Sequence, residues 1–123
     1  NFPKQHIANG SQKNSNTNNN FKPVVRMFKN AKEYMVNNNN FAASSAPSYF
    51  IECLIYNVPD SEFSGNLQDM FCNVLNHYHH NPLDNTLLCQ NDLIKMFGYS
   101  STQWSITSAE YFLESCRQLW NNW

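Results

Sequence analysis

Charged side chains are scarce in this sequence. Asp, Glu, Lys and Arg make up 14% of its 123 residues, against about 25% in typical globular domains. The net charge is −1, whereas proteins that coat nucleic acid need many Lys and Arg side chains to neutralise phosphates. We therefore expect no extended nucleic acid as a partner, and any anion that binds should be small.

Long apolar runs are missing as well. No stretch approaches the length of about 18 consecutive apolar residues that indicates a membrane-spanning helix. No leader of basic, apolar and small residues opens the chain. We therefore expect neither a membrane span nor a signal peptide. Because the chain starts with Asn1 rather than Met, we also expect that an upstream part precedes it.

Metal and redox motifs are not found either. The four cysteines occur singly, without the close pairing of zinc sites or thioredoxin-like motifs. Their apolar surroundings predict reduced core thiols, and hence a cytoplasmic protein. His77, His79 and His80 form a cluster, but no nearby carboxylate or Cys completes a ligand set. We expect no metal site in this chain.

The pattern of the remaining residues predicts helices. Apolar residues recur at three- and four-residue spacing over residues 21–36, 67–80 and 107–120, and residues 48–58 are apolar on nearly every side, which is typical of a buried helix. A further helix is predicted from about Leu87 to Phe97. Residues 1–20 are polar and lack a periodic apolar face. This predicts an all-α fold: a five-helix bundle over residues 21–123, after a polar extended segment, residues 1–20, from an upstream lobe or a linker.

One face of the helix expected over residues 21–36 is basic. At about 100° per residue, Lys22, Arg26 and Lys29 lie within a narrow arc, opposite the apolar side. The next helix opens with Ser48 and Tyr49, which supply a hydroxyl and an aromatic ring. This combination indicates a site for a nucleotide phosphate, although most charged stripes are simply solvated faces. Tyr49 has the alternative of an ordinary core aromatic.

Glu52 lies within the otherwise apolar helix and needs a partner, because an unpaired buried carboxylate is costly. We expect Arg26 to pair with Glu52. This pair would lock the two helices together and orient Lys29, a structural role for Glu52. Lys22 is either a peripheral phosphate contact or a solvated side chain.

The chain resembles the C-terminal helical half of bacterial nucleotidyltransferases related to cyclic GMP-AMP synthase and oligoadenylate synthase. The resemblance covers most of the chain, and its later part, from Phe97-Gly98 to Trp120, is less specific. The motifs that carry it are Asn9-Gly10, Lys13-Asn14, Thr17, Phe21-Lys22, Val25-Arg26, Lys29-Asn30, Pro47-Ser48-Tyr49 and Glu52.

The resemblance implies a two-lobed enzyme that makes a cyclic oligonucleotide second messenger in antiphage defence. Its helical lobe would bind ATP or GTP, with Lys29 and Ser48 at the donor triphosphate and Tyr49 stacked on a base. The alternative is a helical interaction module without a nucleotide ligand.

The catalytic motif of that family is missing from this chain. Gly10-Ser11 is not followed by the Asp-x-Asp or Glu-x-Asp pair that would hold the metal ions. The two-metal chemistry needs such clustered carboxylates. We therefore expect no catalytic residue here, a missing N-terminal catalytic lobe as partner, and Mg²⁺ only together with that lobe.

Overall fold

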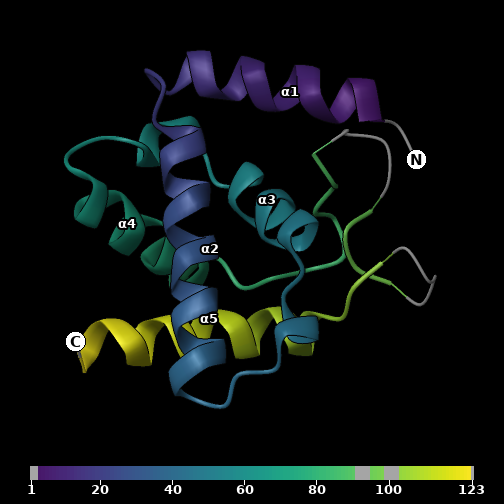
Figure 1. Ribbon diagram of the computed structural model, residues 1–123. Helices are drawn as coiled ribbons and strands as arrows, with labels where there is room; N and C mark the ends of the chain where they lie inside the picture. The colour runs from purple at the N-terminus through teal and green to yellow at the C-terminus, as the bar shows by residue number, and fades with distance from the viewer. Residues whose placement is uncertain (1–2, 91–94, 99–102, 123) are drawn as a thin grey trace.

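A long central helix, α2, organises the fold (Figure 1). The computed structural model describes residues 3–90, 95–98 and 103–122. These residues form five α-helices and two short 3-10 turns. The elements are α1 (Pro3–Asn16), α2 (Phe21–Asn38), η1 (Ala43–Ser45), α3 (Ser48–Tyr56), η2 (Asp60–Glu62), α4 (Leu67–His80) and α5 (Ile106–Asn121). All four other helices contact α2, with α1 across one end of it and α5 across the other.

The predicted all-α class is confirmed, because the described residues contain helices and only isolated β-bridges. The core lies where α2, α3, α4 and α5 meet. Phe28 of α2 is fully buried and stacks on Phe71 of α4, with the ring centroids 4.3 Å apart. The helix α3 is buried along most of its length, as expected. None of the described helices has the length and apolar character to cross a membrane.

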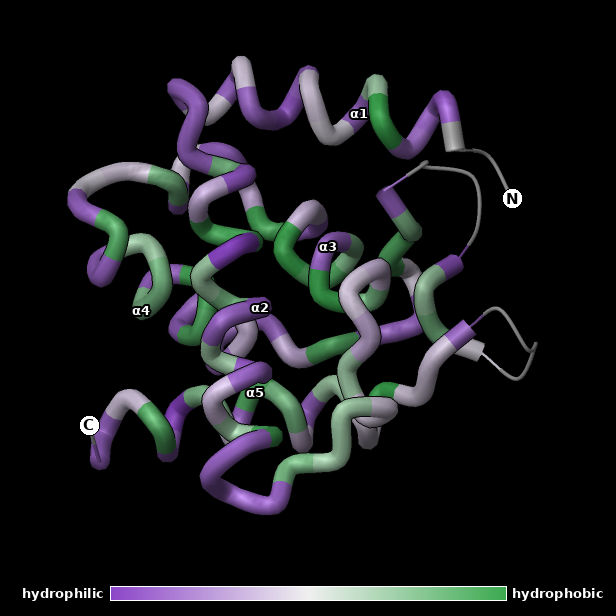
Figure 2. Tube along the Cα trace, viewed as in Figure 1, coloured by the Kyte–Doolittle hydropathy of each residue, from purple (hydrophilic) through white to green (hydrophobic). Residues whose placement is uncertain are grey.

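The sequence prediction was wrong for the segment that contains α1. Residues 1–20 were expected to be extended, but Pro3–Asn16 is helical and packs against α2. The prediction was wrong because α1 is anchored through polar groups, and Figure 2 shows it as largely hydrophilic beside the hydrophobic α3. The division of the chain at residue 20 into an upstream segment and a helical domain stays a prediction.

Lys13 is the main anchor of the C-terminal end of α1. Its side chain is buried, and its Nζ donates hydrogen bonds to the Val58 carbonyl and to Asp60 Oδ1, both at 2.7 Å. The same ammonium lies 5.1 Å from the centroid of the Phe63 ring, within range of a cation–π interaction. A polar residue therefore occupies the position that an apolar one takes in an ordinary amphipathic helix.

The helix expected from Leu87 to Phe97 is not found in the described part of that range. Leu88 instead forms an antiparallel bridge with Lys95, and Phe97 forms a parallel bridge with Trp104. Met96 is fully buried from this non-helical path. Phe97 is buried and Leu88 is half-buried, but the spacing of the apolar residues did not distinguish a helix from a folded loop. Residues 91–94 of the expected helix lie outside the described residues.

Capping residues mark the starts of α5 and α4. The helix α5 begins earlier than expected, because Ser105 is the capping residue and its hydroxyl accepts a hydrogen bond from the Ser108 N–H. The helix α4 has the predicted bounds, and a capping box formed by Asn66 and Asp69 starts it.

All four cysteines are free thiols, and three of them are buried, as their apolar surroundings predicted.

We expect Lys13→Ala to destabilise the protein. The substitution leaves the Val58 carbonyl without its donor and Asp60 without its counter-ion. A hydrogen bond to a charged group contributes about 1.5–3 kcal/mol, and the bond to the Val58 carbonyl is the buried one. The pair with Asp60 is screened by solvent, because that carboxylate is 48% exposed, and it adds little. The free energy of unfolding should therefore fall by about 1.5–3 kcal/mol. Urea denaturation measures the change, and Lys4→Ala, which removes an exposed charge from the same helix, is the control. Equal stability of the two variants would contradict the anchoring role.

Candidate functional site

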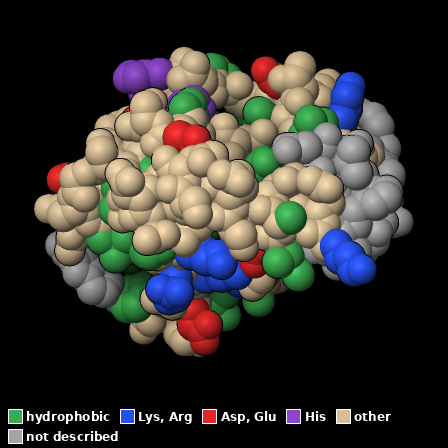
Figure 3. All heavy atoms as spheres, turned by 90° about the horizontal axis from the view of Figure 1, so that it is seen from above, with side chains coloured by type: hydrophobic (Ala, Val, Ile, Leu, Met, Phe, Trp, Pro, Cys, Tyr) green, Lys and Arg blue, Asp and Glu red, His purple; other side chains and the backbone are tan. Residues whose placement is uncertain are grey.

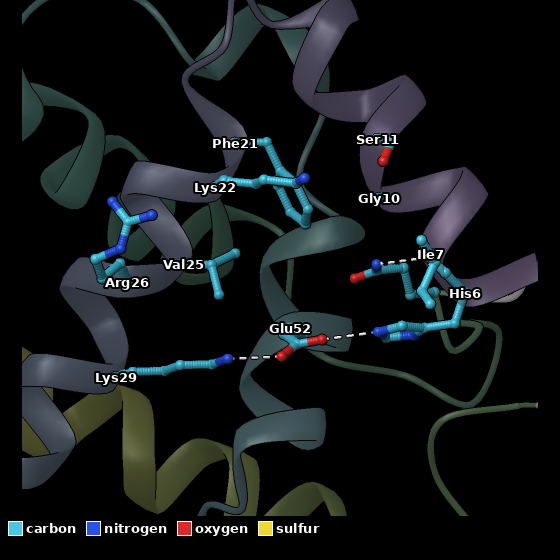
Figure 4. Close-up of a pocket in the computed structure, with 11 residues that line it drawn as sticks. His6, Ile7, Gly10, Ser11, Phe21, Lys22, Val25, Arg26, Lys29 and Glu52 are labelled. Carbon is cyan, nitrogen blue, oxygen red and sulfur yellow. Dashed lines mark hydrogen bonds and ion pairs between the residues drawn. The ribbon is translucent and has the colours of Figure 1, made fainter. Parts of the chain in front are cut away.

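The candidate site is a pocket between α1, α2 and α3, which we call the α1–α2 pocket (Figure 4). Its volume is about 430 Å³. Helix α1 provides one wall and α2 the opposite wall, while α3 and the segment that ends at Gln90 complete it. The side chains that matter for its chemistry are His6, Lys22, Arg26, Lys29, Glu52 and Gln90.

The predicted basic face of α2 is confirmed as one wall of this pocket. Lys22, Arg26 and Lys29 all line it. Lys22 and Arg26 are exposed, whereas the Lys29 side chain is one third exposed. Figure 3, which views the molecule from the α1 side, shows a group of Lys and Arg side chains in the lower part of the view, with acidic side chains beside them. The pocket can therefore offer several cations to one anionic ligand.

Glu52 is the centre of the polar network in the pocket. Its Oε2 accepts a hydrogen bond from Lys29 Nζ at 2.6 Å, and its Oε1 lies 2.7 Å from His6 Nε2. Lys29 and His6 reach the carboxylate from opposite sides. The three residues come from α2, α1 and α3, so this single carboxylate connects three helices.

The expected pair between Arg26 and Glu52 is wrong. In the described residues Glu52 forms its ion pairs with Lys29 and His6, and Arg26 is exposed on α2. Both Arg26 and Lys29 lie on the face of α2 toward the pocket, but only Lys29 is close enough to Glu52 to form an ion pair. Glu52 connects α3 to α2 and α1 through Lys29 and His6, and the structural role assigned to it stays a prediction.

The pKa of Glu52 is lowered by this network. Burial opposes ionisation of the carboxyl group, but the hydrogen bonds and positive charges of Lys29 and His6 outweigh that effect and bring the pKa below its ordinary value of 4.5. The carboxylate therefore stays ionised at neutral pH and keeps Lys29 in place.

Ser48 and Tyr49 lie at the start of α3 and do not line the α1–α2 pocket. Ser48 is exposed. Tyr49 is half-buried and packs between two rings, with its centroid 4.8 Å from that of His6 and 5.5 Å from that of Trp104. Burial raises the pKa of Tyr49, with a further contribution from Cys53 and Cys89. The nucleotide roles assigned to both residues stay predictions, as does the alternative of a core aromatic for Tyr49.

His6 and Gln90 are the residues of the pocket that the sequence did not reveal. His6 lay in a segment without an apolar face, and Gln90 lay in the range expected to be helical. A signal for α1 was nevertheless present, because His6, Gly10, Lys13 and Thr17 recur at three- and four-residue spacing, as on one face of a helix.

We expect the stabilising effect of Glu52 to depend on pH. A carboxyl group whose pKa is lower in the folded state contributes stability above its unfolded pKa and loses it as the pH falls through the folded value. Wild-type protein should therefore unfold at a higher temperature than Glu52→Gln at pH 7. This difference should shrink as the pH falls below about 4.5. Thermal unfolding from pH 7 to pH 3 tests this expectation, and a difference that is independent of pH would contradict it.

Known proteins share this helical architecture. Residues 8–121 match the family described as the cGAS/DncV-like nucleotidyltransferase C-terminal helical domain. A cyclic UMP-AMP synthase from Rhodothermus marinus is 45% identical over 123 residues, which are all of this chain and 42% of that protein. The chain thus spans about two fifths of the length of this relative.

Two solved structures resemble the fold closely. The structure of Rhodothermus marinus CdnE c-UMP-AMP synthase with Apcpp and Upnpp has a TM-score of 0.94 at 44% identity, over 100% of this chain and 41% of that one. The Elizabethkingia meningoseptica CdnE cyclic dinucleotide synthase with GTP and Apcpp has a TM-score of 0.84 at 32% identity, over 97% of this chain and 44% of that one. The sequence match and the shared helical fold show that this chain belongs to the family of cGAS/DncV-like nucleotidyltransferase C-terminal helical domains.

Proposed function

We propose that this chain is the nucleotide-holding helical half of a synthase that makes a cyclic oligonucleotide signal in bacterial antiphage defence. The basic wall of the α1–α2 pocket carries the proposal, because Lys22, Arg26 and Lys29 are held on one face of α2. The similar structures support it, since one contains Apcpp and Upnpp and the other contains GTP and Apcpp. The proposed ligand of this chain is a nucleoside triphosphate, either ATP or GTP.

Lys29 is the proposed main contact to the triphosphate. Its ammonium group has three N–H donors, and one of them is used by Glu52 Oε2. The remaining donors can reach phosphate oxygens while Glu52 holds the side chain in the pocket. Lys22 and Arg26 add charge on the same wall.

Ser48 and Tyr49 extend the proposed site along α3. Ser48 lies four residues before Glu52, so the two share one face of this helix. The first turn of α3 also presents backbone N–H groups, which favour anions. Tyr49 contacts His6 of the pocket and offers an aromatic face to a base, an interaction worth about 1–3 kcal/mol in single-stranded nucleic acid complexes.

Catalysis requires a part of the protein other than this helical unit. The described residues contain no group of three or more His, Cys, Asp or Glu side chains that could hold a metal ion. In this proposal the catalytic carboxylates and Mg²⁺ belong to an N-terminal lobe, which is the partner of this chain. The helical half binds and orients the nucleotide and does not take part in the bond-forming step.

A helical interaction module is the second candidate function. An apolar groove on the other side of α2 favours it, lined by Met27, Tyr34, Phe71 and Trp120 among others. Tyr34 and Trp120 are exposed, and exposed apolar patches often mark interaction surfaces. This candidate requires no nucleotide, so a binding measurement distinguishes the two functions.

We expect Lys29→Ala to weaken nucleotide binding by about 10-fold to 100-fold in the full-length protein that carries this chain. This factor corresponds to the loss of one charged hydrogen bond, about 1.5–3 kcal/mol. Titration calorimetry with ATP and GTP, with and without Mg²⁺, measures the change. Lys22→Ala, at an exposed position, should have a smaller effect.

The control for this experiment is Lys95→Ala, which removes an exposed positive charge outside the pocket. It should leave the dissociation constant unchanged. If wild type, Lys29→Ala and Lys95→Ala all bind nucleotide equally well, the basic face is a solvated surface. If the wild type binds no nucleotide, the interaction-module function gains support.

A further inference from the structure

Gln90 is a buried wall residue of the α1–α2 pocket that is held by three hydrogen bonds. Its backbone N–H donates to Cys53 Sγ at 3.4 Å, and its backbone carbonyl accepts from Asn9 Nδ2 at 2.8 Å. Its side-chain Nε2 donates to the His6 carbonyl at 2.8 Å. The residue is 4% exposed, so its side chain has little freedom to move.

These bonds determine which way the side-chain amide faces. The His6 carbonyl requires a donor, so Nε2 must face it, because the flipped amide would place two oxygen atoms against each other. Oε1 is therefore the free end of the amide. It is buried and has no hydrogen-bond partner among the residues that the structure describes. A buried acceptor without a partner is rare in native structures and calls for an explanation.

Gly10 allows the Gln90 amide to approach α1 closely. A Cβ atom at Gly10 would lie 2.3 Å from Gln90 Nε2, so any side chain at this position would displace the amide. Glycine in the interior of a helix is otherwise unfavourable relative to alanine. The close approach of Gln90 to α1 therefore explains why glycine occupies this position.

His6 lies beside Gln90 on the same side of the pocket. Its Nε2 is 2.7 Å from the Glu52 carboxylate, and its Nδ1 is buried without a partner in the described part of the chain. The Gln90 oxygen therefore presents an acceptor on this side of the pocket, whereas α2 presents the cations Lys22, Arg26 and Lys29.

We propose that Gln90 is a specificity-determining residue, whose Oε1 accepts a hydrogen bond from an N–H or O–H group of the nucleoside part of the bound nucleotide. This inference rests on the proposed function. Phosphate oxygens are acceptors and are repelled by a carbonyl oxygen, so the phosphates face the cations of α2. The nucleoside carries the donors, which are the ribose hydroxyls and the base N–H groups, and it faces Gln90.

The test compares nucleotides that have or lack one donor. The probes are ATP, GTP and UTP, their 2′-deoxy and 3′-deoxy forms for the ribose, and purine riboside triphosphate and N3-methyl-UTP for the base. Wild-type full-length protein should bind the analogue that lacks the group read by Gln90 about 3-fold to 10-fold more weakly than its parent nucleotide. In Gln90→Met this ratio should fall to about one. The analogue for which this happens identifies the donor.

Two further variants make the result specific to the Gln90 oxygen. Gly10→Ala favours the helix but displaces the Gln90 amide, so it should also abolish the discrimination, and it serves if Gln90→Met does not fold. Gln68→Met lies outside the pocket, on the apolar groove, and should keep the wild-type ratio. Thermal unfolding of each variant checks that it is folded.

The outcomes separate this inference from the proposed function. If Gln90→Met weakens the binding of all nucleotides equally, Gln90 has only a packing role and the inference is overturned. The inference is also overturned if the ratio between analogue and parent nucleotide is the same in Gln90→Met as in the wild type. Either result leaves nucleotide binding itself intact. A wild-type protein that binds none of the probes would overturn the proposed function, and the inference with it.

Discussion

The Glu52 carboxylate is the group on which the geometry of the α1–α2 pocket depends. It lies on a mostly buried helix, where an ionised carboxylate is unfavourable unless charged donors surround it. Lys29 and His6 provide those donors from two other helices, at 2.6 and 2.7 Å. Removing one partner of such a pair costs more than the pair contributes, because the remaining charge is left uncompensated. The requirement to satisfy Glu52 therefore fixes α1 and α2 relative to α3, and with them both walls of the pocket.

Helix α1 explains why the sequence revealed only part of the fold. Apolar spacing predicted α2, α3, α4 and α5, since each buries an apolar face against the others. The buried face of α1 is instead made of polar residues and glycine, namely His6, Gly10 and Lys13, and Thr17 continues it just past the end of the helix. Each of these finds a specific partner or a close contact in another part of the chain or in the next turn. Hydrophobicity cannot identify such a face, because burial here follows from hydrogen bonding that exists only after folding.

The candidate site, too, could be predicted only in part from the sequence. The basic face of α2 could be predicted, because helical geometry alone places Lys22, Arg26 and Lys29 on one side. The partner of Glu52 could not be predicted, since it depends on how far α2 and α3 are offset along their axes. Likewise, the apolar residues around Met96 had to be buried, but short apolar runs do not distinguish a helix from a folded loop. Local periodicity therefore predicts which residues share a face, and only the packed structure determines what that face meets.

The scarcity of charge in this chain gives the pocket its electrostatic character. Three of the eight Lys and Arg residues line it, so a large share of the positive charge lies on one wall. The net charge of −1 provides no general attraction for anions, and charges separated by more than about 8 Å are largely screened at physiological salt. An anionic ligand is therefore attracted only once it is close to α2, where the cations act together. The affinity of such a ligand must therefore come from direct contacts with this wall and not from the field of the whole chain.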